Sequence, residues 1–530
     1  MKFTQIPFQK TGFFSKTMTD YLVQKESIQE FYHNFPDMEG FTAQIEEKKN
    51  SFPSATREEL VAVLQEQYSN VSISDAILEN INSLKNQDTF TITTGHQLNL
   101  FTGPLYFLYK IISAINLSEE LAEKFPSQHF VPVYWMATED HDFEEINYFN
   151  FKGKKVKWNR SDGGAVGRFS LDGLQDVFAS FSDQLGDSIN AVYLSQLFKK
   201  AYLEHSNLSQ ATRYIANELF KDYGLVILDA DDQRLKKIFT PIMKDELMHQ
   251  RSFKAVSKTI TSLKKEYQIQ VNPREINLFY VTENSRERII EEAGQYRVYD
   301  TDIIFSKDEI FNELENHSER FSPNVIMRPV YQELILPNLC YIGGGGEIAY
   351  WLQLKAYFET IHVPFPILLL RNSVQIVSNK QVKKLHALNI SYEEIFMKQH
   401  LLIAKKVQEN SDIQFSFADA TELLIQQFLA LRRIANATDV SFIGAVDAQQ
   451  RKQLKGLENL EKRLLRAEKR KQSDVTNRIT ELQNQLLPNK SLEERQRNFS
   501  EYYLEYGHDL IIALKESLKP LQQAFTILEL

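Results

Sequence analysis

Residues 91–147 decide the fold class and read TITTGHQLNLFTGPLYFLYKIISAINLSEELAEKFPSQHFVPVYWMATEDHDFEEIN. Two short apolar runs, Phe90–Thr93 and Phe130–Met136, have the length and the β-branched or aromatic content of buried strands. Between them, Gly103 and Pro104 start a helix, because proline is well tolerated in a first helical turn. The apolar residues that follow recur every three to four positions, as in a helix that packs on a sheet. The stretch therefore predicts a βαβ unit.

Each predicted strand is followed by a group of polar side chains. The first group is Thr94, Gly95, His96 and Gln97, and the second is Glu139, Asp140, His141 and Asp142. In open α/β sheets, ligands bind at the carboxyl ends of the strands. We therefore expect the two groups to contribute to one binding site.

The first group has the composition of a phosphate-binding turn. Gly95 allows the backbone to approach a ligand, and His96 could donate a hydrogen bond to a phosphate. Helix amides near Gly103–Leu105 suit an anion. The chain lacks both GxGxxG and GxxxxGK[ST], so neither a dinucleotide fingerprint nor a P-loop is present. The alternative is a tight turn with a solvent-facing histidine.

The second group places carboxylates beside an imidazole. This combination suits Mg²⁺–phosphate chemistry, recognition of a substrate ammonium, or acid–base catalysis. Adjacent residues cannot all converge on one ion, so no metal ligands are assigned. The alternative is an acidic helix start that complements the helix dipole.

A glycine run near residue 345 forms a third candidate. Gly343, Gly344, Gly345 and Gly346 precede Glu347 and a predicted helix, and such a run exposes N–H groups or bare backbone to a ligand. Upstream, Arg328 could make a bidentate contact with a carboxylate or phosphate, and Gln332 belongs to the same motif. A purely structural turn is the alternative.

Two further strand ends carry candidates. Asp229 follows the apolar run Leu225–Leu228 and could bind ribose hydroxyls or an ammonium group, or serve as a cap. Arg371 follows the run Pro366–Leu370. The single cysteine, Cys340, lies among apolar residues, which is typical of a small core residue.

The overall composition indicates a multidomain protein. A chain of 530 residues with 43% hydrophobic residues is expected to form two or three packed domains. The net charge of −9 argues against a general nucleic-acid binder. No segment approaches the roughly 20 apolar residues of a membrane span, and the N-terminus lacks a signal-peptide pattern. We expect a cytoplasmic protein without nucleic-acid or membrane partners.

The predicted organisation alternates core segments with insertions. It consists of an N-terminal helical layer (1–85), a first half of the core (86–155), an inserted module (156–215), a core segment (216–250), a second inserted module (251–323), a second half of the core (324–390) and a helical coiled-coil domain (391–530). Within the last region, two heptad stripes are out of phase near Lys471, and Pro488 ends the first arm. We expect one of two arrangements. Either a second helix, Leu492–Tyr506, folds back against that arm, or the arm forms a coiled coil with a second copy of the chain.

Four long motifs, TGHQLNLFTGPLY, PVYWMATEDHDFEEIN, RPVYQELILPN and YIGGGGEIAYWLQL, occur in this order. With them the whole chain resembles the cysteine-adding enzymes of bacillithiol biosynthesis. The resemblance implies an α/β fold with a Rossmann-type parallel-sheet core, related to class I aminoacyl-tRNA synthetases and nucleotidylyltransferases. It also implies inserted connecting modules and a coiled-coil domain that forms a homodimer.

The implied reaction joins L-cysteine to the amino group of glucosaminyl malate in the last step of bacillithiol biosynthesis. ATP would activate the cysteine carboxylate as an adenylate or an acyl-phosphate, with Mg²⁺ as a possible companion. The family motif is often TGQQ, and its glycine run often contains proline. Since His96 replaces a glutamine, it is assigned to binding rather than to catalysis.

The resulting hypothesis divides the roles among the candidates. His96, the helix start at Gly103–Pro104 and the glycine run are assigned to bind phosphates, and Glu139, Asp140 and Asp142 to bind Mg²⁺ or the cysteine ammonium. Arg328 or Arg371 is assigned to bind the malate carboxylates. His141 is assigned as the base that deprotonates the attacking amine. Two alternatives stay open: a nucleotidylyltransferase acting on another small substrate, and a non-catalytic coiled-coil scaffold.

Overall fold

A five-stranded parallel sheet lies at the centre of the computed structural model, which describes residues 2–160, 163–413 and 415–530. Its strands are β2 (Thr89–His96), β3 (His129–Met136), β6 (Val226–Asp229), β12 (Asn338–Gly343) and β13 (Ile367–Leu370), in the spatial order β13-β12-β2-β3-β6. All neighbouring pairs are parallel. Numbered along the chain, the order is 3-2-1-4-5, which is the Rossmann arrangement. The predicted fold class is confirmed.

The sheet is covered by helices on both faces, which explains its nearly continuous apolar strands. Helix α7 (Tyr106–Lys124) connects β2 to β3 and packs against both, while α4 (Met38–Ser51) packs against β12 and β13. Helices α5 (Ser54–Gln67) and α6 (Asp75–Ser83) complete much of the N-terminal layer.

The carboxyl ends of the five strands lie at one edge. His96 pairs in register with Met136, which pairs with Asp229, and Gly343 pairs with Leu370. Strands β2 and β12 are neighbours at the point where the strand order reverses. Ligands of doubly wound sheets bind in the crevice at this switch point.

Strand β12 differs from the sequence-based expectation. The apolar run Leu334–Leu336 has the composition of a short buried strand, but helix α15 (Arg328–Ile335) includes most of it, and the strand begins only at Asn338. The run is apolar because the helix buries one face, and Pro329 occupies the first helical turn. Cys340 is a free cysteine inside β12, and burial raises its pKa well above the ordinary value. This thiol is a core group and not a nucleophile.

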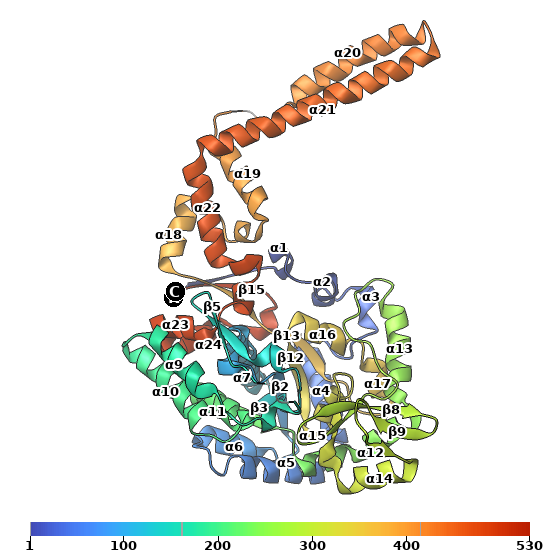
Figure 1. The fold of residues 1–530 in the computed structure, drawn as a ribbon, viewed down its shortest axis with the longest axis vertical. Helices are drawn as coiled ribbons and strands as arrows, with labels where there is room; N and C mark the ends of the chain where they lie inside the picture. The colour runs from blue at the N-terminus through green and yellow to red at the C-terminus, as the bar shows by residue number, and fades with distance from the viewer. Residues whose placement is uncertain (1, 161–162, 414) are drawn as a thin grey trace.

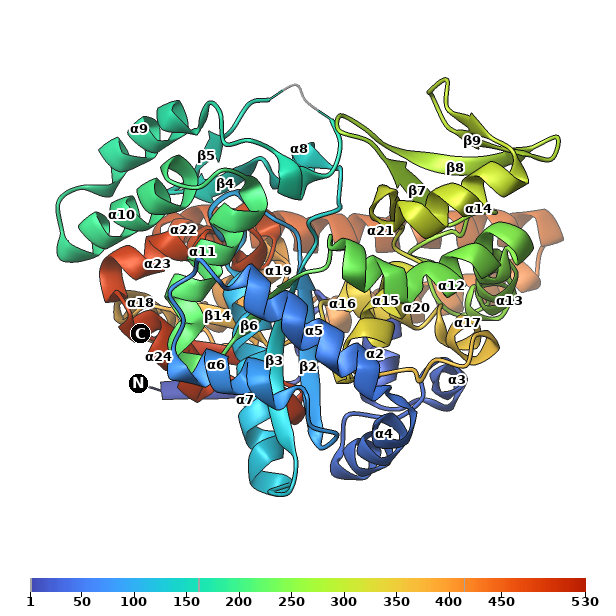
Figure 2. The same ribbon diagram turned by 90° about the horizontal axis from the view of Figure 1, so that it is seen from below.

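Two insertions flank the carboxyl edge of the sheet, and Figure 2 shows them on either side of the short helix α8 (Phe143–Ile146). The first contains the hairpin β4 (Tyr148–Phe151) and β5 (Lys154–Lys157), followed by α9 (Leu174–Leu185), α10 (Ile189–Leu203) and α11 (Leu208–Phe220). The second follows α12 (Gln233–His249) and contains α13 (Arg251–Leu263), α14 (Lys307–Asn316) and an antiparallel sheet of β7 (Leu278–Val281), β8 (Arg286–Glu292), β9 (Gln295–Val298), β10 (Ile304–Phe305) and β11 (Phe321–Pro323).

A helical stalk projects from the body (Figure 1). It comprises α19 (Gln399–Glu409), α20 (Ala418–Asn436), α21 (Val440–Lys471) and α22 (Ser473–Leu486). The long helix is interrupted at Gln472, where the predicted stutter lies. Its antiparallel partner is α20, which contacts it extensively. The prediction that Leu492–Tyr506 folds back on the stalk is wrong, because α23 (Phe499–Tyr506) packs on α10 of the body.

The chain returns to the body after the stalk. Strand β15 (Phe525–Glu529) lies between β1 (Lys2–Ile6) and β14 (Ser373–Val377) in a three-stranded sheet. Neither β1 nor β15 was predicted, since both ends of the chain were read as helical. The return segment from Glu493 to Asn498 lies against the start of α7 and against β14. In the described ranges, no helix has the length and apolar character needed to cross a membrane.

Candidate active site

A cavity of about 770 Å³ opens at the carboxyl edge of the central sheet. The structure brings most of the predicted site residues into its wall: Gly95, His96, Gln97, Glu139, Asp140, His141, Arg328, Gly344, Gly345, Gly346, Glu347 and Arg371. The second insertion contributes Phe279, Arg286 and Arg288 from β7 and β8. Three residues of each predicted polar group therefore line one cavity at the strand ends, and a role in ligand binding stays a prediction.

Several predicted residues lie outside this wall: Thr94, Gly103, Pro104, Asp142, Asp229, Gln332 and Gly343. Thr94 donates a hydrogen bond to the Ile342 carbonyl oxygen (2.8 Å) and so links β2 to β12. Asp142 is exposed at the start of α8. Asp229 accepts hydrogen bonds from Thr138 (2.6 Å) and Ser209, so its carboxylate organises a strand end.

The start of α7 is occupied by the protein itself. The Leu105 N–H donates to the Arg497 carbonyl oxygen (2.7 Å), and the Asn498 amide donates to the carbonyl oxygens of Phe101 and Gly103. Gly103 has a positive φ of 63°, which favours glycine at this turn. The return segment therefore fills the position that the sequence suggested for an anion near Gly103–Pro104.

An ion pair between a buried lysine and a partly exposed glutamate lies at the switch point. The Lys110 amine is 2.6 Å from the Glu347 carboxylate and donates to the Gly95 carbonyl oxygen at 2.6 Å. Glu347 also accepts hydrogen bonds from the Tyr341 hydroxyl and the Gly344 N–H, both at 2.8 Å. Burial lowers the pKa of Lys110, whereas for Glu347 the nearby ammonium outweighs burial and lowers its pKa. The pair joins α7 to the glycine run across the crevice.

Lys110 was not predicted as a site residue, although the sequence shows it as a single charge in an apolar helix. It is the only charged residue between Leu105 and Ser118, a segment that otherwise faces the sheet. A lone lysine in an apolar helix needs a partner, because an unpaired buried charge is costly. The glycine run also differs from expectation: Gly344 is the N-cap of α16 (Gly345–Trp351), and its N–H is already bonded to Glu347.

Arg328 presents a guanidinium group without a carboxylate partner in the described part of the chain. It donates to the Gln332 amide oxygen (3.1 Å) and to the Tyr350 hydroxyl (3.2 Å). Its charge lies 5.7 Å from the Trp135 ring centroid and 5.6 Å from that of Tyr341. Neutral acceptors and aromatic rings thus hold Arg328 in place and leave its charge available to an anion.

Arg371, in contrast, already binds a carboxylate. Its guanidinium makes a bidentate contact with Glu494 (2.7 and 3.1 Å), and both side chains are buried. Its Nε atom has no partner among the described residues and lies 3.8 Å from the position that a side chain at Gly344 would occupy. Among the described residues, Glu494 therefore already occupies the bidentate face of Arg371, which the sequence suggested as one of two holders of the malate carboxylates.

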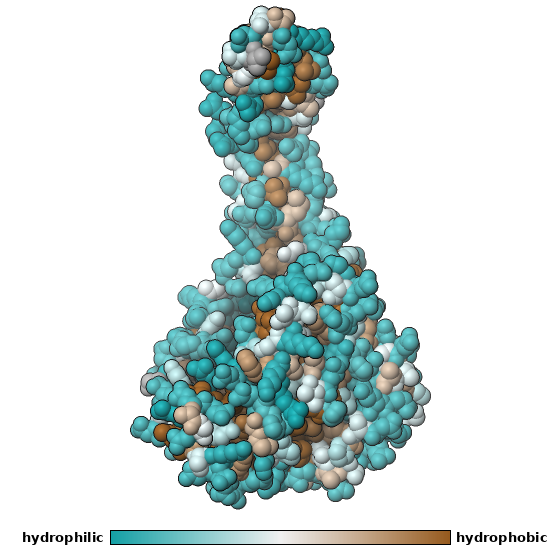
Figure 3. Space-filling view, turned by 90° about the vertical axis from the view of Figure 1, so that its right-hand side faces the viewer, coloured by the Kyte–Doolittle hydropathy of each residue, from teal (hydrophilic) through white to brown (hydrophobic). Residues whose placement is uncertain are grey.

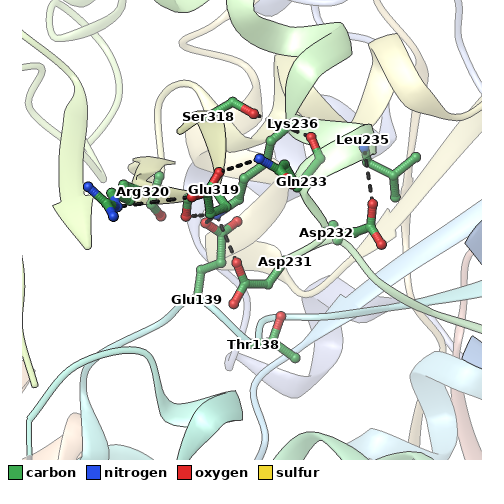
Figure 4. Close-up of polar contacts among 12 residues, drawn as sticks. Thr138, Glu139, Asp231, Asp232, Gln233, Leu235, Lys236, Ser318, Glu319 and Arg320 are labelled. Carbon is green, nitrogen blue, oxygen red and sulfur yellow. Dashed lines mark hydrogen bonds and ion pairs between the residues drawn. The ribbon is translucent and has the colours of Figure 1, made fainter. Parts of the chain in front are cut away.

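Glu139 belongs to an ion-pair network beside the cavity (Figure 4). The Lys236 amine lies 2.7 Å from Glu139 and 2.8 Å from Asp231, and Arg168 of the first insertion makes a bidentate contact with Asp231. Burial opposes the charge of Lys236, but the two carboxylates outweigh it and raise its pKa. Lys236 thus already neutralises Glu139, which the sequence suggested for a metal ion or a substrate ammonium.

His141 and Asp140 connect the wall to its neighbours. The Arg286 guanidinium donates to His141 Nδ1 (2.9 Å), since arginine has no acceptor, so the imidazole is neutral with its proton on Nε2. Burial and Arg286 both lower the pKa of His141. In this arrangement His141 offers a donor and not the predicted base. Asp140 accepts from the Gln97 amide (2.8 Å), which joins the two polar groups.

His96 is buried under Tyr106 and Phe107, and its Nε2 atom has no partner in the described ranges. Burial lowers the pKa of His96 to about 3 from its ordinary 6.5. Between these values the unfolded chain binds a proton that the folded protein excludes, so stability falls as the pH decreases through this window.

We expect His96→Gln to remove this dependence. Relative to the variant, the wild type is expected to lose about 2 kcal/mol of unfolding free energy between pH 7.5 and pH 5. Urea titrations at both pH values measure the difference. His400→Gln, at an exposed position on α19, is the control and is expected to leave the wild-type pH dependence intact. Equal pH dependence of His96→Gln and wild type would contradict the assignment.

The cavity as a whole suits an anionic ligand. Its charged lining consists of Lys110, Arg274, Arg286, Arg288, Arg328, Arg371 and Arg495 against Glu139, Asp140 and Glu347. Such an excess of positive charge in a crevice attracts anions. In the described ranges, no group of three or more His, Cys, Asp or Glu side chains is arranged to hold a metal ion.

Comparisons with known proteins match the whole chain. The family model described as "Bacillithiol biosynthesis BshC, N-terminal Rossmann-like domain" matches residues 1–372, and its C-terminal coiled-coil counterpart matches residues 374–530. A protein of Flavobacterium johnsoniae is 56% identical over 99% of both chains, and one of Christiangramia forsetii is 55% identical over 99% of this chain and 98% of its own. One of Cytophaga hutchinsonii is 39% identical over 97% of both. All three relatives are named "Putative cysteine ligase BshC".

Proposed function

Because this chain belongs to the bacillithiol biosynthesis BshC family, we propose that it is a cytoplasmic ligase that joins the carboxylate of L-cysteine to the amino group of glucosaminyl malate in the last step of that pathway. The observation that carries the proposal is the cationic cavity at the switch point of the Rossmann-type sheet, built around Lys110 and Glu347. Each proposed ligand of this cavity carries at least one carboxylate or phosphate, which matches its charge.

Amide formation requires an activated carboxylate, because a free carboxylate is a poor electrophile. ATP would supply this activation as an adenylate or an acyl-phosphate. Three features support a nucleotide ligand. The cavity lies at the switch point, Gly344–Gly346 allow close approach of the backbone, and the lining residues His96 and Arg371 each have a buried ring or guanidinium nitrogen without a partner among the described residues. Asp140 is the candidate carboxylate for an accompanying Mg²⁺ ion, since Lys236 already neutralises Glu139.

The protein's own side chains would divide the remaining tasks. Arg328, which no described carboxylate pairs, would hold a malate carboxylate of the sugar substrate. Lys110 would stabilise the negative charge that develops on the cysteine carboxyl oxygen during attack, in a crevice where burial strengthens the interaction. His141 would orient a substrate acceptor through its Nε2–H, because Arg286 holds Nδ1.

The direct test is an assay of the purified protein with ATP, L-cysteine and glucosaminyl malate, followed by mass spectrometry of the product. We expect the condensed product only when all three are present, and nucleotide consumption that depends on cysteine. Equal consumption without cysteine would instead favour a nucleotidylyltransferase that acts on another substrate. Absence of both product and nucleotide turnover would favour a non-catalytic scaffold.

We also propose that the stalk forms a homodimer. Figure 3 shows apolar side chains along the stalk, and on α20 Leu423 and Ile434 are 67% and 59% exposed. Burial of such residues between two copies would remove apolar surface from water. Light scattering is expected to give twice the chain mass for the wild type and the mass of one chain for Leu423→Glu/Ile434→Glu. A monomeric wild type would refute this proposal.

A further inference from the structure

We propose that Arg495, which the chain supplies after the coiled-coil stalk, binds an anionic group of a substrate inside the cavity. The group is a carboxylate or a phosphate, and both are present among the ligands of the proposed reaction. The inference rests on the proposed function for the identity of those ligands. It adds a binding residue from the C-terminal family domain to a cavity that the Rossmann-like domain otherwise forms.

Arg495 is an exposed arginine that lines the cavity together with Arg371 and Tyr106. No carboxylate or other hydrogen-bond acceptor contacts its side chain within the described ranges. The neighbouring positive charge of Arg371 is neutralised by Glu494. Arg495 is therefore a solvent-accessible positive charge on the cavity wall that no described carboxylate neutralises.

The backbone that carries Arg495 is held on both sides. On one side, Glu494 makes the bidentate contact with Arg371, and Glu493 accepts from Gln375 (2.9 Å) and lies 3.0 Å from Arg497. On the other side, Asn498 donates to the carbonyl oxygens of Phe101 and Gly103. Two consecutive buried glutamates thus direct the third residue of the turn, Arg495, toward the cavity.

This arrangement lowers the cost of binding. A ligand that contacts an arginine on a mobile surface segment must order both the side chain and its backbone, whereas here the backbone is already ordered. The planar guanidinium forms two parallel hydrogen bonds with a carboxylate or a phosphate. The unpartnered Nε atom of Arg371 lies on the same wall. Together these groups form a cationic part of the cavity wall.

The test compares Arg495→Gln and Arg495→Lys with a matched control, Arg433→Gln, at an exposed arginine of α20 far from the cavity wall. Calorimetry measures binding of glucosaminyl malate and of ADP separately. We expect Arg495→Gln to weaken one of them about 10- to 100-fold, which corresponds to the loss of a charge-assisted contact. Weaker binding of glucosaminyl malate identifies a carboxylate, and weaker binding of ADP identifies a phosphate.

Kinetics give a second measure that a purely structural role would not reproduce. The KM for the affected substrate is expected to rise by a similar factor, with kcat within about twofold, because the interaction is made equally in the ground and transition states. Arg495→Lys is expected to recover part of the affinity, since it retains the charge and loses the planar fork. The control variant and the thermal unfolding midpoint of all variants are expected to match the wild type.

The outcomes separate this inference from the proposed function. If the wild type forms no product but Arg495→Gln still weakens one of the two ligands, the ligase proposal fails and the role of Arg495 stands. If the wild type forms product and Arg495→Gln binds both ligands normally, the role of Arg495 is wrong. A wild type that binds neither ligand at millimolar concentration would overturn both.

Discussion

Replacement of Lys110 by methionine is expected to lower the rate of product formation by about 10³-fold. Removal of one electrostatic donor from a preorganised site costs roughly 10²- to 10³-fold in rate, and Lys110 also holds Glu347 and the Gly95 carbonyl oxygen in place. The measurement is single-turnover product formation with saturating substrates. A rate within tenfold of the wild type would exclude Lys110 from the reacting centre.

The partner variants separate catalysis from folding. Lys110→Met leaves the Glu347 charge unpaired in the crevice, and Glu347→Gln leaves the Lys110 charge unpaired, so each is expected to lower the unfolding free energy by about 3 kcal/mol. The double variant Lys110→Met/Glu347→Gln removes both charges and is expected to recover most of this loss. It should remain inactive, since Lys110 is absent. Recovery of activity in the double variant would show that the lysine acts only through stability.

Replacement of Glu494 by alanine is expected to lower the free energy of unfolding of the body by about 3–5 kcal/mol. Loss of one partner from a buried ion pair leaves the other charge unpaired away from water. Arg371 is buried and receives its bidentate contact from this residue alone among the described carboxylates. The three tryptophans, Trp135, Trp158 and Trp351, all lie in the body and report its unfolding by fluorescence in urea.

The matched control for this change is Glu516→Ala. Glu516 is exposed on α24 (Asp509–Ser517), and its replacement is expected to alter the unfolding free energy by no more than about 0.5 kcal/mol. A loss in Glu494→Ala as small as in the control would show that the return segment does not depend on this ion pair. Glu494→Ala is also expected to weaken ligand binding through Arg495, because the same contact positions the turn.

Local pattern was sufficient to identify most of the central sheet. The apolar runs at Phe90–Thr93 and Phe130–Met136 lie inside β2 and β3, and Leu225–Leu228 overlaps β6, because strands buried on both faces are apolar throughout. Strand β12 was missed for a related reason. The buried face of α15 produced an apolar run next to it, and short apolar runs do not distinguish a buried helix from a buried strand.

The candidate site was predicted where its residues follow strand ends and missed where they do not. Gln97, Asp140 and the glycine run meet at the cavity because parallel strands end at one edge. Lys110 lies on a helix, and Arg286 and Arg495 come from an insertion and from the C-terminal segment. No local periodicity relates these three residues to the sheet.

The sequence by itself determined the α/β class, the polar strand ends and the family, because these depend on residue types at short spacing. Only the tertiary structure decided which charges are neutralised. Glu494 pairs with Arg371 across 123 positions of the chain, and Lys236 pairs with Glu139, whereas no described carboxylate pairs with Arg328 or Arg495 on the cavity wall. Charge pairing depends on distance through space, since the interaction energy falls with separation and not with position along the chain. Distances in the folded chain therefore decide which charged residues form internal ion pairs and which remain available to bind substrates.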